Sequence, residues 1–180
     1  MAYVYDVVML KNFVLVGDSQ LNRLACYCKV DSSLCFPGNS ISELCSKLKH
    51  LGGLPQNIIL LIGSNDLKKD VDEHGLKRDY RSLVKFILRN CKRVILVATP
   101  VIPKRAWDPN HFVKLQVLND MLYSFQSDSR VSVVDLRTYF KGEITKPEFF
   151  ERYYYDRRRD MLHLNALAFD FLLELLQPLL

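Results

Sequence analysis

The sequence lacks any apolar run of the roughly 20 residues that a membrane-spanning helix requires. Its most apolar stretch, residues 169–180, is interrupted by Asp170, Glu174, Gln177 and Pro178. The chain also lacks a basic N-terminal segment followed by a long apolar core and a small-residue cleavage site, which a secretory signal needs. These absences favour a protein, or a domain of a larger protein, that stays inside the cell, and we expect a cytoplasmic location.

The cysteine pattern is equally poor in metal and disulfide signals. No C-x-x-C pair occurs, and no cysteine lies at metal-ligand spacing from a histidine. An odd number of thiols is typical of a reducing compartment, so we expect free, buried thiols and no metal site. A disulfide between Cys26 or Cys28 and Cys35 is the alternative. The five cysteines are Cys26, Cys28, Cys35, Cys45 and Cys91.

The composition suits a single globular domain that spans residues 1–180. Hydrophobic residues make up 49% of the 180 positions, which is enough to bury a sizeable core. The chain contains no internal repeat, no low-complexity tract and no linker rich in Gly and Ser. Nothing in the sequence indicates the oligomeric state.

Continuous apolar runs predict strands that are buried on both faces, which is typical of a parallel sheet. These runs cover residues 13–16, 58–62, 94–98 and 131–135. A short fifth strand is expected between Cys28 and Phe36. Helical spacing of apolar residues fills the intervening segments, from Ser40 onward, from about 74 to 90, from 109 to 125 and from 165 to 176. The alternation predicts an α/β fold, a three-layer α/β/α sandwich with right-handed crossovers.

A serine hydroxyl follows the first predicted strand without a linker. Gly17-Asp18-Ser19 comes directly after residues 13–16, at the strand end where α/β sheets carry their chemistry. Glycine allows a sharp turn into the next helix, and the Ser19 N–H can then point toward a developing oxyanion.

Downstream, Asp160 and His163 lie three residues apart where the last helical stretch opens. A serine, an acid and a histidine in this chain order are what acyl transfer by a hydroxyl requires, with Ser19 as nucleophile and His163 as base. The alternative is a helix N-terminus that carries a surface histidine. We expect the other histidines, His50, His74 and His111, to lie on the surface.

Two further polar motifs suit an oxyanion hole. In Pro37-Gly38-Asn39-Ser40 the glycine lets a backbone N–H approach a ligand closely, and in Gly63-Ser64-Asn65-Asp66-Leu67 the Asn65 amide can donate to an oxygen that gains charge. Taken singly, each motif has an ordinary explanation. Gly38 would be a loop glycine before a helix capped by Asn39 or Ser40, and the second motif would be a plain turn.

The segment before Asp160 is the most basic and aromatic in the chain. One interpretation is a solvated loop whose aromatic rings pack on the domain edge. The other is a positive rim for an anionic ligand such as RNA or an anionic membrane surface, with Tyr153 to Tyr155 stacking on bases. Its basic residues are Lys146, Arg152, Arg157, Arg158 and Arg159, interleaved with Phe149, Phe150, Tyr153, Tyr154 and Tyr155.

Taken together, the four motifs resemble those of the SGNH (GDSL-type) hydrolase superfamily and occur in that family's order. The resemblance implies a flavodoxin-like sandwich with a parallel five-stranded sheet and a serine esterase that hydrolyses acetyl or lipid esters through an acyl-enzyme. It implies no metal and no organic cofactor. The implied residues are the triad Ser19, Asp160 and His163, with oxyanion donors from Ser19, Gly38 and Asn65.

Two details depart from the commonest family pattern. Gln20 follows the serine where secreted members often carry leucine, and the second block holds a single glycine, Gly38, beside a proline. These details are similar to the esterase domains of some non-LTR retrotransposons and to the C-terminal domain of the insect protein Oskar. The first comparison implies ester hydrolysis. The second implies RNA binding through a basic surface with little or no hydrolysis, for which Arg152, Arg157, Arg158 and Arg159 are the candidate contacts.

Overall fold

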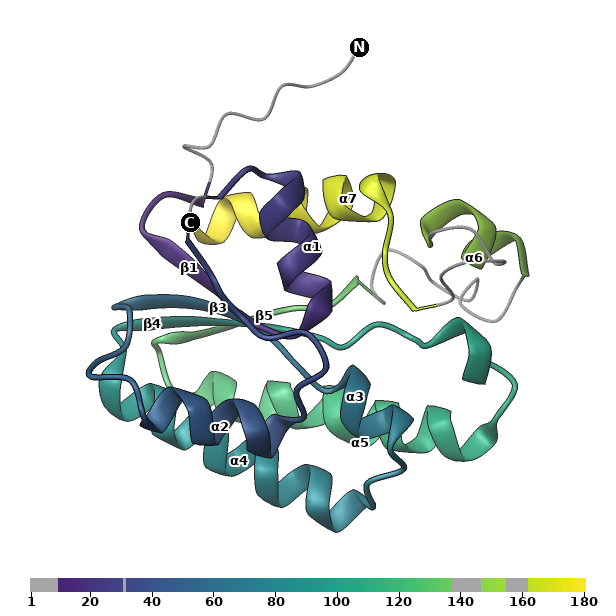
Figure 1. Ribbon diagram of the computed structural model, residues 1–180, viewed down its shortest axis with the longest axis horizontal. Coiled ribbons are helices and arrows are strands. Elements are labelled where there is room, and N and C mark those ends of the chain that lie inside the picture. The colour runs from purple at the N-terminus through teal and green to yellow at the C-terminus, as the bar shows by residue number, and fades with distance from the viewer. Residues whose placement is uncertain (1–9, 31, 137–146, 155–161) are drawn as a thin grey trace.

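A five-stranded parallel sheet lies at the centre of the computed structural model, which describes residues 10–30, 32–136, 147–154 and 162–180 (Figure 1). Its spatial order is β2-β1-β3-β4-β5, and every neighbouring pair is parallel. This order is the flavodoxin-like one, so the predicted fold class is confirmed. The strands are β1 (Phe13–Gly17), β2 (Leu34–Cys35), β3 (Asn57–Leu61), β4 (Arg93–Val97) and β5 (Val131–Val134).

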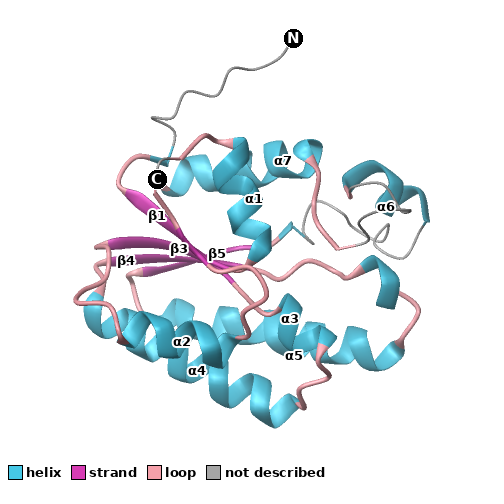
Figure 2. Cartoon of the chain, in the orientation of Figure 1, coloured by secondary structure: helices cyan, strands magenta, loops and turns pink. Residues whose placement is uncertain are grey.

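Helices cover both faces of this sheet and produce the three predicted layers (Figure 2). One face carries α1 (Ser19–Tyr27) and α7 (Ala166–Leu176), whereas the other carries α2 (Ile41–Lys49), α4 (Glu73–Asn90) and α5 (Pro109–Ser124). The remaining α-helices of the described residues are short: α3 (Ser64–Lys68) after β3 and α6 (Pro147–Tyr153) before α7. Among the described residues, no helix is long and apolar enough to cross a membrane.

The strands form where apolar side chains follow one another, because both faces of the sheet are covered. Leu15 and Val16 of β1, Ile58 to Leu61 of β3 and Val94 to Val97 of β4 are all buried. The predicted strand and helix bounds agree with the structure to within about one residue, which is as close as element ends can be defined.

Most helices begin at a polar side chain that accepts a hydrogen bond from an otherwise unpaired helix N–H. Ser40 and Glu43 form a complete capping box at the start of α2, so the predicted role of Ser40 as a cap is correct. The other side-chain caps are Asp18 for α1, Asp72 for α4, Asp108 for α5 and Asn165 for α7.

Gly17 is required for a reason other than the expected one. Its backbone does not adopt the left-handed conformation. Instead, a Cβ at this position would lie 2.0 Å from the carbonyl oxygen of Leu61 on the neighbouring strand β3. The absence of a side chain therefore lets the ends of β1 and β3 approach each other directly beneath Ser19.

A Gly17→Ala variant is expected to lose at least about 2 kcal/mol of unfolding free energy, because relieving the contact requires backbone movement in two central strands. Chemical denaturation measures this loss. Gly52→Ala is the matched control, because a Cβ at Gly52 meets nothing within 4 Å and should change stability by less than about 0.5 kcal/mol. Equal unfolding free energies of the two variants would contradict the conclusion that a side chain at position 17 collides with the Leu61 carbonyl.

Candidate active site

The predicted site residues gather where β1, β2 and β3 end. Ser19 opens α1 directly after β1, Gly38 lies in the turn after β2, and Asn65 lies in α3 after β3. In the order β2-β1-β3-β4-β5 the connections leave in opposite directions on either side of the gap between β1 and β3, and ligands of open α/β sheets bind at such a point. The topology thus brings three separate motifs to one place.

Ser19 and His163 meet at this place, although they are 144 residues apart in the sequence. The His163 Nε2 atom lies 2.9 Å from the Ser19 Oγ atom, which is hydrogen-bond distance. Both residues are half-buried, so the pair can be reached from solvent. Asp160, the predicted third member of the triad, lies outside the described residues, and its role stays a prediction.

His163 lies just before α7, whose start agrees with the helix predicted from residue 165. The helix begins only after Asn165, whose backbone N–H donates to the Tyr153 carbonyl at 3.0 Å. One residue earlier, Leu164 forms an isolated antiparallel bridge with Tyr154. The histidine is therefore carried by a short segment that pairs with the end of α6.

Gln20 ties the same segment to α1. Its buried side chain donates from Nε2 to the Leu162 carbonyl at 2.8 Å and accepts at Oε1 from the Leu164 N–H at 3.2 Å. These two backbone groups stand on either side of His163. The sequence analysis singled out Gln20 only as a departure from the family pattern, because its partners lie more than 140 residues away.

The turn that carries Gly38 is linked to Asn65. Gly38 has a φ of +84°, a conformation that side chains disfavour, and a Cβ there would meet no atom within 4 Å. The buried Asn65 side chain donates from Nδ2 to the Asn39 carbonyl at 2.9 Å. One amide hydrogen of Asn65 thus fixes the side chain, and an amide nitrogen carries a second hydrogen to donate.

Asp66, next to Asn65, also links the loop after β2 to the loop after β3. Both of its carboxylate oxygens accept from the Ile41 N–H at the start of α2, at 3.2 and 3.0 Å. Burial raises the pKa of the Asp66 carboxyl to about 6, while the Ile41 N–H acts in the opposite direction. The loops after β2 and β3 are therefore held by a carboxylate as well as by a carboxamide.

Asp18 is fully buried beside Ser19. Its Oδ1 atom accepts from the Gln20 N–H at 2.9 Å and caps α1. Its Oδ2 atom makes no hydrogen bond of normal geometry with the described residues, although the Ser64 and Gly63 N–H groups are near enough to the carboxyl to lower its pKa. Burial raises the pKa of this carboxyl to about 6; the Gln20 N–H lowers it and the charge of Asp66 raises it further. Two buried carboxyl groups with raised pKa values thus support the candidate site.

Tyr153 and Tyr154 of the basic segment are part of the core, which corrects the base-stacking hypothesis for these two rings, whereas Tyr155 lies outside the described residues. Tyr153 and Tyr154 are 7% and 5% exposed, so neither ring is available to stack on a base. The Tyr154 hydroxyl instead donates to the Val101 carbonyl at 2.7 Å. Phe149 and Phe150 are buried against these rings, with centroids 5.0 to 6.2 Å apart. The α6 helix, for which a loop was one expectation, is a packed support for the histidine segment.

Of the four predicted anion contacts, only Arg152 belongs to the described residues. Arg152 is exposed on α6, with its guanidinium 5.4 Å from the centroid of the Tyr153 ring. Arg157, Arg158 and Arg159 lie outside the described residues. Their proposed contact with RNA stays a prediction.

Two other expectations need correction. His111 is buried rather than at the surface, its Nε2 atom accepts from the Ile102 N–H at 3.3 Å, and burial lowers its pKa. All five cysteines are free, but the expected burial holds only for Cys28, Cys45 and Cys91, because Cys26 is exposed and Cys35 is half-buried. Within the part of the chain that the structure describes, no group of three His, Cys, Asp or Glu side chains could hold a metal ion.

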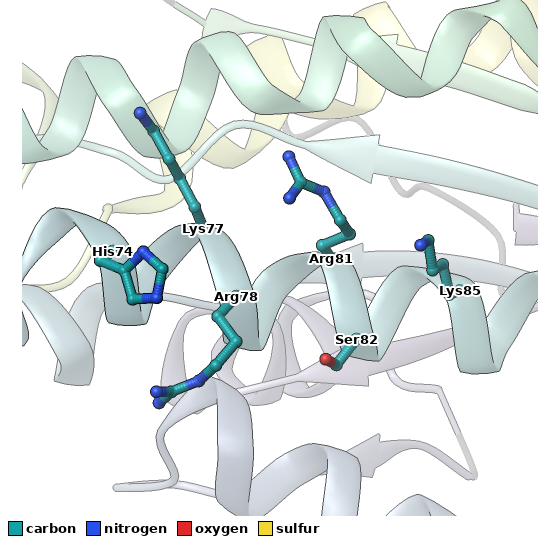
Figure 3. Close-up of a pocket in the computed structure, with 6 residues that line it drawn as sticks. All are labelled: His74, Lys77, Arg78, Arg81, Ser82 and Lys85. Atoms are coloured by element: carbon teal, nitrogen blue, oxygen red, sulfur yellow. The ribbon is translucent and has the colours of Figure 1, made fainter.

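A basic hollow lies on α4, on the opposite face of the sheet from α1 (Figures 1 and 3). Its volume is about 290 Å³. Figure 3 shows Lys77 and Arg81 extending from one flank of the helix and Arg78 from the other. The sequence analysis did not identify this surface, because most of its cations are separated by about one helical turn and do not form a continuous basic run. The lining residues are His74, Lys77, Arg78, Arg81, Ser82 and Lys85.

Comparison with known proteins gives one family and a set of similar folds. The family model of the GDSL-like lipase/acylhydrolase family matches residues 29–169. The matched range includes Gly38, Asn65 and His163 and begins downstream of Ser19. No curated protein sequence matches the chain.

Solved structures share the fold at low sequence identity. The OSK domain of Drosophila Oskar has a TM-score of 0.74 and 21% identity, covering 97% of this chain and 90% of that one. The lipase/acylhydrolase from Enterococcus faecalis has a TM-score of 0.67 and 17% identity, covering 92% and 93%. A member of the lipolytic protein G-D-S-L family from Veillonella parvula DSM 2008 has a TM-score of 0.68 and 13% identity, covering 91% and 94%. The predicted SGNH hydrolase fold is confirmed.

The raised pKa of Asp18 predicts a specific pH dependence of stability. The folded carboxyl, with a pKa of about 6, binds a proton more tightly than the unfolded one at the ordinary value of 3.8. The contribution of the protonated Asp18 carboxyl to the unfolding free energy is therefore fully present below about pH 4 and is lost as the pH rises through 6. Relative to an Asp18→Asn variant, the wild type should lose roughly 2–3 kcal/mol of unfolding free energy between pH 4 and 7.

Denaturant titrations of both proteins at several pH values measure this difference. Asparagine also caps helices, so any constant cost of the substitution leaves the pH slope of the difference unaffected. A difference that stays the same from pH 4 to pH 7 would show that the buried carboxyl does not titrate in this range.

Proposed function

Because this chain belongs to the GDSL-like lipase/acylhydrolase family, we propose that it is a serine esterase that cleaves acyl esters through an acyl-enzyme. The observation that carries the proposal is the 2.9 Å contact between Ser19 Oγ and His163 Nε2. A hydroxyl at its ordinary pKa is a weak nucleophile, and a base within hydrogen-bond distance is what activates it.

The first half of the reaction forms the acyl-enzyme. Ser19 Oγ attacks the ester carbonyl carbon while its proton passes to His163 Nε2. The tetrahedral intermediate then collapses, the bond to the alcohol oxygen breaks, and His163 gives the proton to the departing alcohol. Water activated by His163 hydrolyses the acyl-enzyme in the second half and restores the serine.

Three groups are proposed to stabilise the negative charge of the intermediate. The Ser19 N–H is in the first turn of α1, where helix N–H groups have no intrahelical acceptor. The Gly38 N–H lies in an exposed turn without a side chain, and Asn65 offers the second hydrogen of its anchored amide. Donors fixed before the reaction are worth several kcal/mol each in such sites.

Asp160 is the proposed partner of the His163 ring, which an adjacent carboxylate would hold in the tautomer that accepts from Ser19. The proposed substrates are acetyl or lipid esters. Assays with acetyl, medium-chain and phospholipid esters distinguish between these classes.

Substitution of Ser19 by alanine tests the proposal. The wild type should hydrolyse p-nitrophenyl acetate and react with a fluorophosphonate probe, whereas Ser19→Ala should lose at least about a thousandfold in kcat/KM and all labelling. Its unfolding free energy should change by less than about 1 kcal/mol, because the hydroxyl is half-buried at a helix start.

Ser46→Ala is the matched control, because Ser46 is exposed on α2 and should keep wild-type activity. A wild type that neither reacts with the probe nor cleaves any ester of the panel would refute the esterase proposal.

A second candidate function, nucleic-acid binding, is favoured by the outer face of α4. Lys77, Arg81, Lys85 and Arg89 are exposed at every fourth position, which places them in one row of roughly 18 Å. Like charges at this spacing destabilise a helix, and none of the four has an ion pair within the described ranges of the chain. A polyanion that neutralised the row would remove this repulsion.

A nucleic-acid backbone fits this face better than a membrane. Binding to a lipid surface requires apolar side chains that insert beside the charges, and none of the exposed large hydrophobic side chains belongs to α4. No Phe, Tyr or Trp side chain of α4 is exposed to stack on bases, so the contact would depend on phosphate charge and not on sequence.

Charge reversal of Lys77, Arg81 and Lys85 to Glu should weaken binding to a mixed-sequence RNA oligonucleotide. The slope of log affinity against log salt concentration should fall in magnitude by about 2. Fluorescence anisotropy measures both. The same reversal at exposed Lys68, Lys92 and Lys104 is the matched control, and equal losses in the two triple variants would rule out α4 as the binding surface.

A further inference from the structure

We infer that Gln20 is a positioning residue that sets the place of His163 against Ser19. The inference rests on the proposed function, because it concerns how the same nucleophile and base are brought together. It depends on three hydrogen bonds that link the start of α1 with residues 162–164.

The two ends of the Gln20 carboxamide grip the backbone on both sides of the histidine. Nε2 donates to the carbonyl of Leu162, and Oε1 accepts from the N–H of Leu164. A backbone strand would offer the same pair, one donor and one acceptor. The side chain therefore takes the place of a neighbouring strand for a segment whose other side pairs with Tyr154.

Ser19 and Gln20 are adjacent at the start of α1, so the histidine ring and its backbone are held by consecutive residues. The Gln20 N–H is itself fixed by the Asp18 cap at 2.9 Å, and its side chain is 1% exposed. Rotation of the carboxamide away from residues 162–164 would leave its polar atoms buried without hydrogen-bond partners, which is energetically unfavourable. The position of His163 relative to Ser19 is thus determined by hydrogen bonds of Ser19 and Gln20, two consecutive residues of α1.

Of glutamine, methionine and ionised glutamate, only glutamine meets both requirements. Methionine has similar volume but neither a donor nor an acceptor of comparable strength. An ionised glutamate can accept from Leu164 N–H but presents a second acceptor to the Leu162 carbonyl. A protonated glutamate has one donor and one acceptor and matches glutamine, so its fit depends on pH.

The catalytic consequence is a loss in kcat with little change in KM. Misplacement of a catalytic group by about 1 Å can cost on the order of a hundredfold in rate. We expect Gln20→Met to lower kcat by roughly 10- to 100-fold at every pH. For Gln20→Glu, the ratio of its kcat to that of the wild type should rise as the pH falls, because protonation restores the donor.

This pH-dependent ratio separates positioning from a purely structural role. Damage to the fold would lower the activity of both variants without recovery of Gln20→Glu alone at low pH. Gln116→Met is the matched control, because Gln116 is exposed on α5 and should leave the kinetics unchanged. A Gln20→Glu ratio that is the same at pH 5.5 and pH 8 would overturn the inference.

A second readout does not require turnover. The chain has four histidines, whose imidazole signals can be followed by NMR and assigned with a His163→Asn variant. Gln20→Met should shift the His163 signals and leave those of His50, His74 and His111 in place. Unchanged His163 signals would refute the role of Gln20, whereas an inactive wild type with shifted signals would refute the esterase proposal alone.

Discussion

The contact between Ser19 and His163 is the constraint on which the functional interpretation depends. A separation of 144 residues means that neither the strand–helix turn of Ser19 nor the segment of His163 can create it alone. The parallel sheet brings the carboxyl ends of β1, β2 and β3 together at one end of the sheet. On one face α7 packs beside α1, and Gln20 of α1 hydrogen-bonds to the segment that precedes α7. The sheet topology accounts for the overall proximity of the two segments, and the hydrogen bonds of the Gln20 carboxamide determine their local arrangement.

Buried polar groups are concentrated at the carboxyl ends of these strands. Asp18, Asn65 and Asp66 are all buried there, and each side chain forms at least one hydrogen bond with a backbone group. Such groups stabilise a fold little unless they are hydrogen-bonded, but once bonded they fix loops more specifically than apolar packing does. The loops after β1, β2 and β3 are therefore held in position by buried hydrogen bonds. The raised pKa of the two carboxyl groups follows from the same burial.

The sequence was sufficient for the fold class, the strands and most helices, because buried parallel strands and amphipathic helices have periodic patterns that need no knowledge of partners. It also identified Ser19 and His163, which the structure brings together. It did not predict α6, whose aromatic residues gave no helical pattern that could be separated from a surface loop. The carboxamide bonds of Gln20, the burial of His111 and the core packing of Tyr153 and Tyr154 depend on contacts between distant segments. No local pattern encodes such contacts.

The outermost strand next to β1 also has a bearing on how the protein behaves at high concentration. β2 contains only Leu34 and Cys35, and these residues are paired with Val16 and Gly17 on their inner side. An unpaired edge of two residues offers an incoming chain too short a ladder for stable intermolecular pairing. Within the described residues, the sheet is thus bordered on this side by an edge that offers little for aggregation because it is short, without the charged or proline-containing strands that longer edges require.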